Sequence, residues 1–346
     1  MNITKQIFLL IIFLTSLLEC DVNNRFVIVI PSYKNAEFYK QNLDSVLTQN
    51  YLNYRIIYID DCSPDGTANL VEGYIKENKI EHKITLIKNS KRQLALANIY
   101  KAVISCEDDE IIVLLDGDDW FENHNVLSKL NEEYKNSNIW ITHGNFKFLG
   151  ANLSGSHYYD PNFPQHVVND NLFREYQHGP IHLRTFYTWL FKQIKLEDLF
   201  HEGNFYKMTY DVALLLPMFE MAAERHKFIR DILYIYNDKN PINDHNVSVK
   251  LQHGLNNIIR QKKKYQRLES SKTNFLQNFD NAKADIIYFA DQNNEKNKKI
   301  IEQVKQKIIN FNKLFFIYNA DDEKDIKFYE SLNLEFKDLV LINIVT

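Results

Sequence analysis

The sequence predicts an α/β fold with a mainly parallel β-sheet that is covered by helices on both faces. Between residues 26 and 115, short apolar runs alternate with stretches in which apolar residues recur at helical spacing. Such alternation of strands and amphipathic helices is typical of parallel sheets. The first apolar run, FVIVI at residues 26–30, has no polar alternation, as expected for a strand that is buried on both faces.

The expected elements follow one another in a regular order. The helix expected at 36–49 places Tyr39, Leu43 and Val46 on one face, and Asn35 is a candidate N-cap for it. In chain order, we expect strand 26–30, helix 36–49, strand 55–59, a turn at 63–66, a helix through 70–75, strand 83–87, helix 94–105, strand 111–115 and, later, strand 228–236.

Length and composition indicate an ordinary globular chain. Its 346 residues suggest about two domains, and 45% of them are hydrophobic and 25% charged. The formal net charge of −4 gives no support to a general nucleic-acid-binding role. Beyond residue 20 the cysteines are Cys62 and Cys106, which are too few for a disulfide framework.

Residues 1–20 have the pattern of a secretory signal peptide. Lys5 supplies a positive charge, and the apolar run at 7–18 is shorter than the about twenty residues that span a bilayer. An uncleaved membrane anchor is the alternative. With the signal removed, we expect no integral membrane segment. The chain would then lie in the secretory pathway, the lumen of the endoplasmic reticulum included, or be secreted or periplasmic in a prokaryote.

Polar residues follow each of the first four expected strands. Because ligands bind beyond the carboxyl ends of strands in open α/β sheets, these residues predict a site. An aromatic ring, basic groups and several acids at one edge suit a nucleoside diphosphate with a divalent metal. Neither GxGxxG nor GxxxxGK[ST] is present, which disfavours a dinucleotide fold and a P-loop. The edge residues are Pro31, Ser32 and Tyr33, then Asp60 and Asp61, then Lys88, Asn89 and Arg92, and finally Asp116, Gly117, Asp118 and Asp119.

The acidic segment LLDGDDW at 114–120 has two readings. Asp-Gly is ordinary turn chemistry, so the segment can be a strand-to-turn junction. Three close carboxylates also repel one another, and burying them is unfavourable unless a cation or hydrogen-bond donors are near. That second reading predicts a metal site that faces a ligand.

Three motifs together resemble family 2 glycosyltransferases, which are inverting enzymes with the GT-A fold. They are VIVIPSYKNAEFYKQNLDSVLTQNY, YIDDCSPDGT and LLDGDDW, and each includes the end of an expected strand. The resemblance implies a GT-A domain at 21–246, with a nucleotide-binding half at 25–145 and an acceptor half at 146–246. One departure is NSKRQLALAN, where Ala97 stands at the position usually held by Arg.

The resemblance assigns roles in donor binding. Ser32 and Tyr33 would line the base pocket, Asp61 would hydrogen-bond uracil or another base, and Asp116 would contact the ribose. Asp118 would coordinate Mg²⁺ or Mn²⁺ that bridges the diphosphate. Arg92 either contacts phosphate or is solvated, and hydrogen-bonded turns are the alternative roles for Asp60 and Asp119. The implied nucleotide-sugar residues are Pro31, Ser32, Tyr33, Asp61, Arg92, Asp116 and Gly117.

Catalysis and acceptor binding fall to the second half of the domain. Asp211, in FYKMTYDVALLLPMFEMAAE, is the candidate general base, with a helix N-cap as the other reading. Tyr210 replaces the first acid of a pair that relatives usually carry. His182, Arg184 and Trp189 would line the acceptor or diphosphate pocket, although Trp189 can also be core. His245 is either a third metal ligand or a structural residue.

The implied function is metal-dependent, non-processive transfer of a hexosyl group from a nucleotide sugar, as a UDP-sugar, to an acceptor hydroxyl. The acceptor would be a glycan, protein or lipid. No QxxRW motif is present, which disfavours a polymer-extruding synthase. The alternative is a secreted, non-enzymatic protein that binds glycans or clients. A nucleotidyltransferase is disfavoured because PSYKNAEF lacks a Gly-rich loop.

The C-terminal part of the chain reads as a separate unit. We expect a polar helical connector at 247–280, and the strand–helix rhythm then restarts. Residues 281–346 resemble an incomplete thioredoxin-like segment, as in the non-catalytic domains of protein disulfide isomerases. Without a CxxC motif, no redox chemistry is expected there. The expected elements are strands at 286–289, 314–318 and 339–344 and a helix at 325–331.

Overall fold

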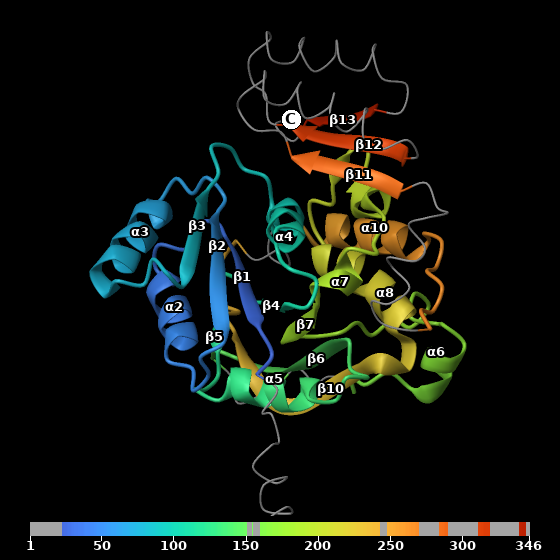
Figure 1. Ribbon diagram of the computed structural model, residues 1–346, viewed down its shortest axis with the longest axis horizontal. Coiled ribbons are helices and arrows are strands. Elements are labelled where there is room, and N and C mark those ends of the chain that lie inside the picture. The colour runs from blue at the N-terminus through green and yellow to red at the C-terminus, as the bar shows by residue number, and fades with distance from the viewer. Residues whose placement is uncertain are drawn as a thin grey trace, which may run out of the picture.

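An eight-stranded mixed sheet organises the chain in the computed structural model (Figure 1). The structure describes residues 23–150, 154, 160–242 and 248–269, and the backbone of strands at 284–289, 311–318 and 339–343. The strand order is β3-β2-β1-β4-β7-β6-β10-β5. The bounds are β1 (Phe26–Ser32), β2 (Tyr54–Asp60), β3 (Ile84–Lys88), β4 (Ile111–Leu114), β5 (Trp120–Phe121), β6 (Ile141–Phe148), β7 (Arg184–Tyr187) and β10 (His226–Tyr236).

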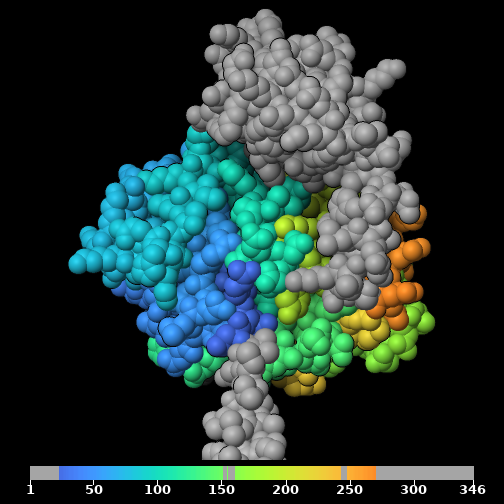
Figure 2. All heavy atoms as spheres, viewed as in Figure 1, coloured from blue at the N-terminus to red at the C-terminus, as the bar shows by residue number. Residues whose placement is uncertain are grey.

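Most of the pairings in this sheet are parallel, as the sequence predicts. β3, β2, β1 and β4 run parallel to one another, and β10 runs parallel to β6. β7 is inserted antiparallel between β4 and β6, and β5 pairs antiparallel with β10. Both halves of the expected domain therefore contribute strands to one sheet. Figure 2 shows the early residues, blue to cyan, on the left and later residues, green to orange, on the right.

Helices cover both faces of the sheet. In β1, Phe26 and Ile28 belong to one hydrophobic cluster, with α2, α3 and α5, whereas Val27 and Val29 belong to another, with α4, α7 and α8. This two-sided burial explains the unbroken apolar run. The bounds are α2 (Tyr39–Leu47), α3 (Thr67–Asn78), α4 (Ala95–Ile104), α5 (Val126–Tyr134), α6 (Gln165–Asn169), α7 (Thr188–Phe191), α8 (Tyr210–Ala222) and α10 (Val249–Arg260), with 3-10 turns η2 (Leu196–Leu199) and η3 (Ala223–Arg225) and the hairpin β8 (Phe200–His201) and β9 (Asn204–Phe205).

The predicted N-cap of the first helix is wrong. α2 begins at Tyr39, and Phe38 occupies the N-cap position without a side-chain capping bond. The side-chain amide of Asn35 instead donates to Ser32 Oγ at 3.0 Å. The main-chain carbonyl oxygen of Asn35 accepts from the amides of Phe38 and Tyr39. Asn35 thus organises the loop after β1 rather than the end of the helix.

The C-terminal strands form a separate three-stranded parallel sheet in the order β11-β12-β13. Their bounds are β11 (Ala284–Phe289), β12 (Phe311–Tyr318) and β13 (Leu339–Asn343). The helix expected at 325–331 and most of the connector beyond residue 269 lie outside the described residues. The thioredoxin-like resemblance therefore stays a prediction.

The predicted signal peptide also lies outside the described residues, and the expected location in a secretory pathway stays a prediction. Among the residues that the structure describes, no helix combines the length and apolar character that crossing a membrane requires.

His143 on β6 is a fully buried histidine in an apolar setting. Neither ring nitrogen has a hydrogen-bond partner in the described structure, and the rings of Phe163, Phe219, His226 and Phe228 lie around it. Burial, together with nearby His226, lowers the pKa of His143 well below its ordinary value. The imidazole is therefore neutral in the fold, and its two nitrogens are unsatisfied.

We expect His143→Phe to stabilise the fold, by about 1–2 kcal/mol near neutral pH, because an apolar ring of similar shape removes the buried polar atoms. Below pH about 6.5 the unfolded chain binds a proton at this position that the folded chain excludes. Stability of the native protein therefore falls as the pH drops below that value, and the variant lacks this part of the loss. Urea unfolding at pH 8 and pH 5 measures both effects. The exposed His82→Phe is the control, and a variant less stable than the native chain at both pH values would contradict the assignment.

Candidate active site

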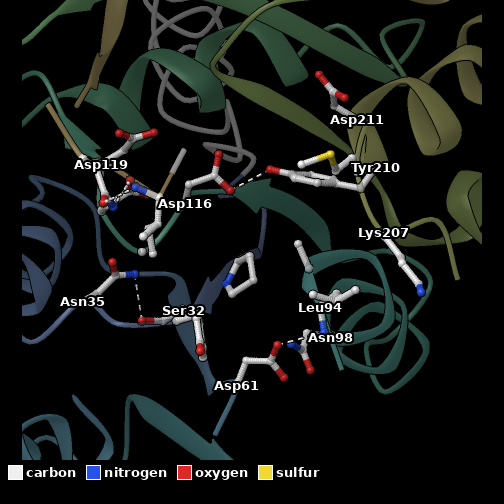
Figure 3. A pocket seen from close by; sticks show the side chains of 18 of the residues that line it. Ser32, Asn35, Asp61, Leu94, Asn98, Asp116, Asp119, Lys207, Tyr210 and Asp211 are labelled. Atoms are coloured by element: carbon white, nitrogen blue, oxygen red, sulfur yellow. Dashed lines mark hydrogen bonds between the residues drawn. The ribbon is translucent and has the colours of Figure 1, made fainter. Parts of the chain in front are cut away.

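A pocket of about 450 Å³ lies beyond the carboxyl ends of β1, β2 and β4, where the sequence places it (Figure 3). The first residues of α4 and α8 also line the pocket. It brings together eleven of the predicted site residues, namely Pro31, Ser32, Tyr33, Asp61, Arg92, Asp116, Gly117, Asp118, His182, Arg184 and Asp211.

The loop after β1 and the acidic loop after β4 approach each other closely at Gly117. A Cβ atom at Gly117 would lie 2.5 Å from Asn35 Nδ2 and 2.8 Å from Ser32 Cβ, so only glycine fits without displacing these side chains. Ser32 Oγ is held at 2.8 Å by the hydroxyl of Tyr58, which donates to it. The amide of Gly117 donates to the carbonyl oxygen of Pro31 at 3.2 Å. These contacts fix the acidic loop against the first strand.

Asp61 anchors the loop that precedes α4. Its carboxylate accepts from the amides of Gln93 and Leu94 at 2.7 and 2.8 Å and from Asn89 Nδ2 at 2.9 Å. The same loop carries Arg92, whose guanidinium lies over the Tyr33 ring, 3.8 Å from its centroid. Asp61 therefore positions a basic group and an aromatic ring at one side of the pocket.

The three acids of the second loop have different surroundings. Asp119 is 1% exposed, and its carboxylate accepts from the Tyr234 hydroxyl at 2.5 Å and the Asn237 amide at 2.7 Å. Burial, with Asp118 and Asp116 nearby, raises the pKa of Asp119 well above its ordinary value. Asp118 Oδ2 accepts from Asn240 Nδ2 at 2.7 Å. The turn reading fits Asp60, whose carboxylate accepts from the Ser63 amide at 3.0 Å, whereas the donors to Asp119 are distant in the sequence.

Asp116 lies at the centre of the pocket, facing the start of α8. Its Oδ1 accepts from the Tyr210 hydroxyl at 2.6 Å, and Figure 3 shows these two side chains pointing toward each other. Burial raises the pKa of Asp116, although Arg184 and the Tyr210 hydroxyl oppose this effect. A half-buried carboxylate with a raised pKa is one that a further positive charge would stabilise.

Arg184, on the inserted strand β7, forms an ion pair with Asp211 at 3.0 Å. Burial opposes the charge of Arg184, but Asp211, Tyr210 and Asp116 outweigh it and raise the pKa of the guanidinium. His182 Nε2 lies 3.3 Å from the same guanidinium, and burial together with Arg184 lowers its pKa well below the ordinary value. His182 is therefore neutral and stacks on the Tyr234 ring at 4.4 Å.

Asp211 occupies the first turn of α8 and is not its N-cap. Thr209 holds the N-cap position, and the helix begins at Tyr210. The N-cap reading of Asp211 is therefore wrong, and its side chain, which is 31% exposed, lines the pocket instead. An acid in a first helical turn is favoured by the helix dipole.

Carboxylate and imidazole groups that suit a divalent cation gather at the acidic loop. Ligand atoms of Asp116, Asp119 and His182 all lie within 4.8 Å of one another, and Asp118 is two residues from Asp116. Oxygen donors with one neutral imidazole fit Mn²⁺ or Mg²⁺. Burial raises the pKa values of Asp116 and Asp119, and a bound cation would favour their charged forms.

The two remaining predicted site residues are Trp189 and His245. Trp189 is 5% exposed and packs edge-to-face on Trp140 at 4.9 Å, so its predicted place in the pocket is corrected to the core. The apolar pattern around Trp189 already allowed this reading. His245 lies outside the described residues, so its role as a metal ligand stays a prediction.

The sequence does not predict several of the site residues. Tyr210 replaces an acid that relatives usually carry, and its hydroxyl donates directly to Asp116. Lys207 lines the pocket as an exposed cation. For Lys207 the one available signal is its place three residues before the Tyr-Asp pair. Tyr234 and Asn240 belong to no recognisable motif. They reach the acidic loop only because β10 packs beside it in the fold.

The comparison with protein families identifies the domain. The model of the family described as "Glycosyl transferase family 2" matches residues 27–200, just over half of the 346-residue chain. The chain belongs to glycosyl transferase family 2. The predicted fold class, a GT-A type mixed sheet with helices on both faces, is thereby confirmed for this glycosyltransferase.

Two curated relatives of this glycosyltransferase come from Streptococcus pneumoniae. GlyG of Streptococcus pneumoniae is 22% identical over 215 residues, which cover 60% of this chain and 69% of GlyG. GlyA of the same organism is 22% identical, and the match covers 62% of this chain but 31% of GlyA. Among solved structures, Staphylococcus aureus TarS in complex with UDP-GlcNAc has a TM-score of 0.49 at 18% identity, covering 65% of this chain and 61% of that one.

Proposed function

We propose that this glycosyltransferase transfers a hexosyl group from a nucleotide sugar, a UDP-sugar in the first instance, to an acceptor hydroxyl with inversion. One observation supports this most strongly. Tyr33, Asp61, Asp116, Asp118 and Asp211, which come from four separate segments, line one pocket at the carboxyl edge of the sheet. The proposed transfer is non-processive, in line with the missing QxxRW motif.

The donor would occupy the side of the pocket formed by the loops after β1, β2 and β4. The Tyr33 ring and Asp61 offer a flat surface and a carboxylate for the base, and Asp116 offers oxygens for ribose hydroxyls. Arg92 and Lys207 bring positive charge to the same pocket, which suits a diphosphate. Because Tyr210 already donates to Asp116, a ribose hydroxyl would share or replace that hydrogen bond.

Asp211 is the proposed general base. Arg184 donates to its Oδ2 at 3.0 Å and the Val212 amide to Oδ1 at 2.9 Å, which together orient the carboxylate. Each oxygen keeps a lone pair that can accept the proton of an acceptor hydroxyl. As that proton moves to Asp211, the hydroxyl oxygen forms a bond to the anomeric carbon. The bond from that carbon to the diphosphate breaks, and its electron pair leaves with the nucleoside diphosphate.

A divalent cation, Mn²⁺ or Mg²⁺, would be held by Asp118 with members of the cluster Asp116, Asp119 and His182. When bound, such a cation supplies Lewis-acid stabilisation of the charge on a departing diphosphate. The protein's own contribution is to keep the acidic loop rigid through Gly117 and Tyr234.

Asp118→Ala tests the assignment. We expect it to reduce both donor hydrolysis and transfer by about 10²–10³-fold, equivalent to several kcal/mol of transition-state stabilisation. The assay measures UDP release from a panel of UDP-sugars with and without Mn²⁺. Ligand-induced thermal shifts measure donor binding by the same proteins.

The matched control is Asp231→Ala, an exposed acid on β10 that pairs with Lys129 at the surface. The control variant should keep native activity. If Asp118→Ala retained native activity in the presence of metal, the proposed role of Asp118 would be wrong. If no UDP-sugar shifted the melting temperature of the native chain, the UDP-sugar assignment itself would be rejected.

A further inference from the structure

A second pocket, of about 780 Å³, adjoins the donor pocket on the far side of Asp211. The two pockets share six lining residues, namely His182, Arg184, Thr209, Asp211, Tyr236 and Gln252. The proposed base therefore lines both cavities. A molecule bound in the second pocket can place one of its hydroxyl groups next to Asp211. Its other lining residues come from the ends of β6 and β10, the segment before β7 and the exposed side of α10.

One wall of this second pocket is aromatic. Phe146 and Phe148 of β6 and Tyr236 of β10 line it, and all three rings are half-buried. Their centroids lie 5.1 to 5.7 Å apart, and each pair packs edge-to-face. Edge-to-face packing fixes the rings against one another, so they present a preorganised surface of ring faces and edges to the cavity.

Much of the remaining lining is polar, and it includes the carboxylates of Asp211 and Asp238. α10 contributes Gln252, His253 and Asn256 to the lining. Arg260 also lines the pocket, but its Nη1 donates to three main-chain carbonyl oxygens and its Nε to Asn256 Oδ1. Arg184 is likewise paired, with Asp211. The two guanidinium groups thus have protein partners already, and the described residues of the lining offer amides and carboxylates rather than free positive charge.

We propose that the second pocket binds a carbohydrate acceptor. This proposal rests on the proposed function, for which it names the class of acceptor. A pyranose has one apolar face of C–H groups, which carry partial positive charge and pack on the negative faces of aromatic rings. Its edge carries hydroxyls, which suit the amide donors and acceptors of Gln252 and Asn256. A polyol phosphate would need free cations, and a lipid chain would need apolar walls on both sides.

Phe148→Ala tests the proposal, with Leu149→Ala as the matched control. Leu149 is the next residue along the chain, is 39% exposed and does not line the pocket. The probes are maltose, lactose and chitobiose, each measured by saturation-transfer NMR and calorimetry against ribitol 5-phosphate and a threonine-containing peptide. We expect at least one disaccharide to bind the native chain, Phe148→Ala to weaken it at least tenfold, and Phe148→Tyr and Leu149→Ala to keep it within about threefold. Gln252→Ala, on the surface of α10, gives a second variant if Phe148→Ala does not fold.

Release of UDP from UDP-sugars by the native chain separates the two proposals, because donor hydrolysis needs no acceptor. Hydrolysis without binding of any disaccharide would overturn the carbohydrate assignment and leave the proposed function standing. Preferential binding of ribitol 5-phosphate or of the peptide would also overturn it. Disaccharide binding that is sensitive to Phe148→Ala, in a chain that neither binds nor hydrolyses UDP-sugars, would support the pocket and reject the transferase mechanism.

Discussion

Asp211→Asn is expected to lower kcat for transfer by about 10²–10⁴-fold, the usual contribution of a general base. Asparagine keeps the shape of the side chain but cannot take the proton of the acceptor hydroxyl. The KM for the nucleotide sugar should change far less, since Asp211 borders the second pocket, where we propose that the acceptor binds. Steady-state kinetics with varied donor and acceptor measure both quantities, and UDP release without acceptor gives the background rate.

Two controls make this result specific. Asp231→Asn removes a surface carboxylate from β10 and should leave kcat unchanged. A thermal melt of Asp211→Asn checks the fold, because the substitution also takes the ion-pair partner from buried Arg184. A folded Asp211→Asn variant with native kcat would show that another group is the base.

Arg174→Ala is expected to destabilise the fold by about 3–5 kcal/mol, because it leaves the Glu220 carboxylate buried without its cation. The Arg174 and Glu220 side chains are 3% and 0% exposed, and they form two hydrogen bonds of 2.6 and 2.9 Å. Arg174 Nη1 also donates to the carbonyl oxygen of Ile259, and Glu220 accepts from the amide of Tyr265. The pair thus joins α8 to the end of α10 and the segment after it.

Urea unfolding of three variants tests this expectation. The matched control is Arg25→Ala, which removes an ion pair of 2.7 Å with Asp109 whose side chains are about half exposed. Such a surface pair contributes about 0–1 kcal/mol. The double variant Arg174→Met with Glu220→Leu should recover much of the lost stability, since it removes both charges and refills the volume. Equal losses in Arg174→Ala and Arg25→Ala, or no recovery in the double variant, would contradict the assignment.

The sequence predicts the β1 to β4 half of the sheet closely, because each of those strands is mainly apolar and is followed by polar loop residues. The polar residues after these strands can also be recognised from the local sequence. Eleven of the predicted site residues line one pocket. Asn35 shows the limit of the capping rule. Its amide is used by Ser32 in the loop, so the preference of asparagine for helix starts does not apply.

The rest depends on contacts between distant segments. β7 is a four-residue strand inserted antiparallel between β4 and β6, and nothing in its own sequence fixes that position. The same insertion brings Arg184 opposite Leu114, at the end of β4, and so beside the acidic loop. Tyr210 reaches Asp116 across 94 positions and Tyr234 reaches Asp119 across 115, which local periodicity cannot reveal.

The pairing of β5 with β10 has a consequence for the order in which the protein becomes competent during synthesis. All three acids of LLDGDDW have emerged by residue 119, but the groups that hold Asp119, on Tyr234 and Asn237, arrive more than a hundred residues later. Until β10 docks beside β5 and β6, the sheet has open edges and the acidic loop lacks its hydrogen-bond donors. The pocket therefore assembles late, by long-range closure of the sheet, and a nascent chain that carries every recognisable motif has no formed site.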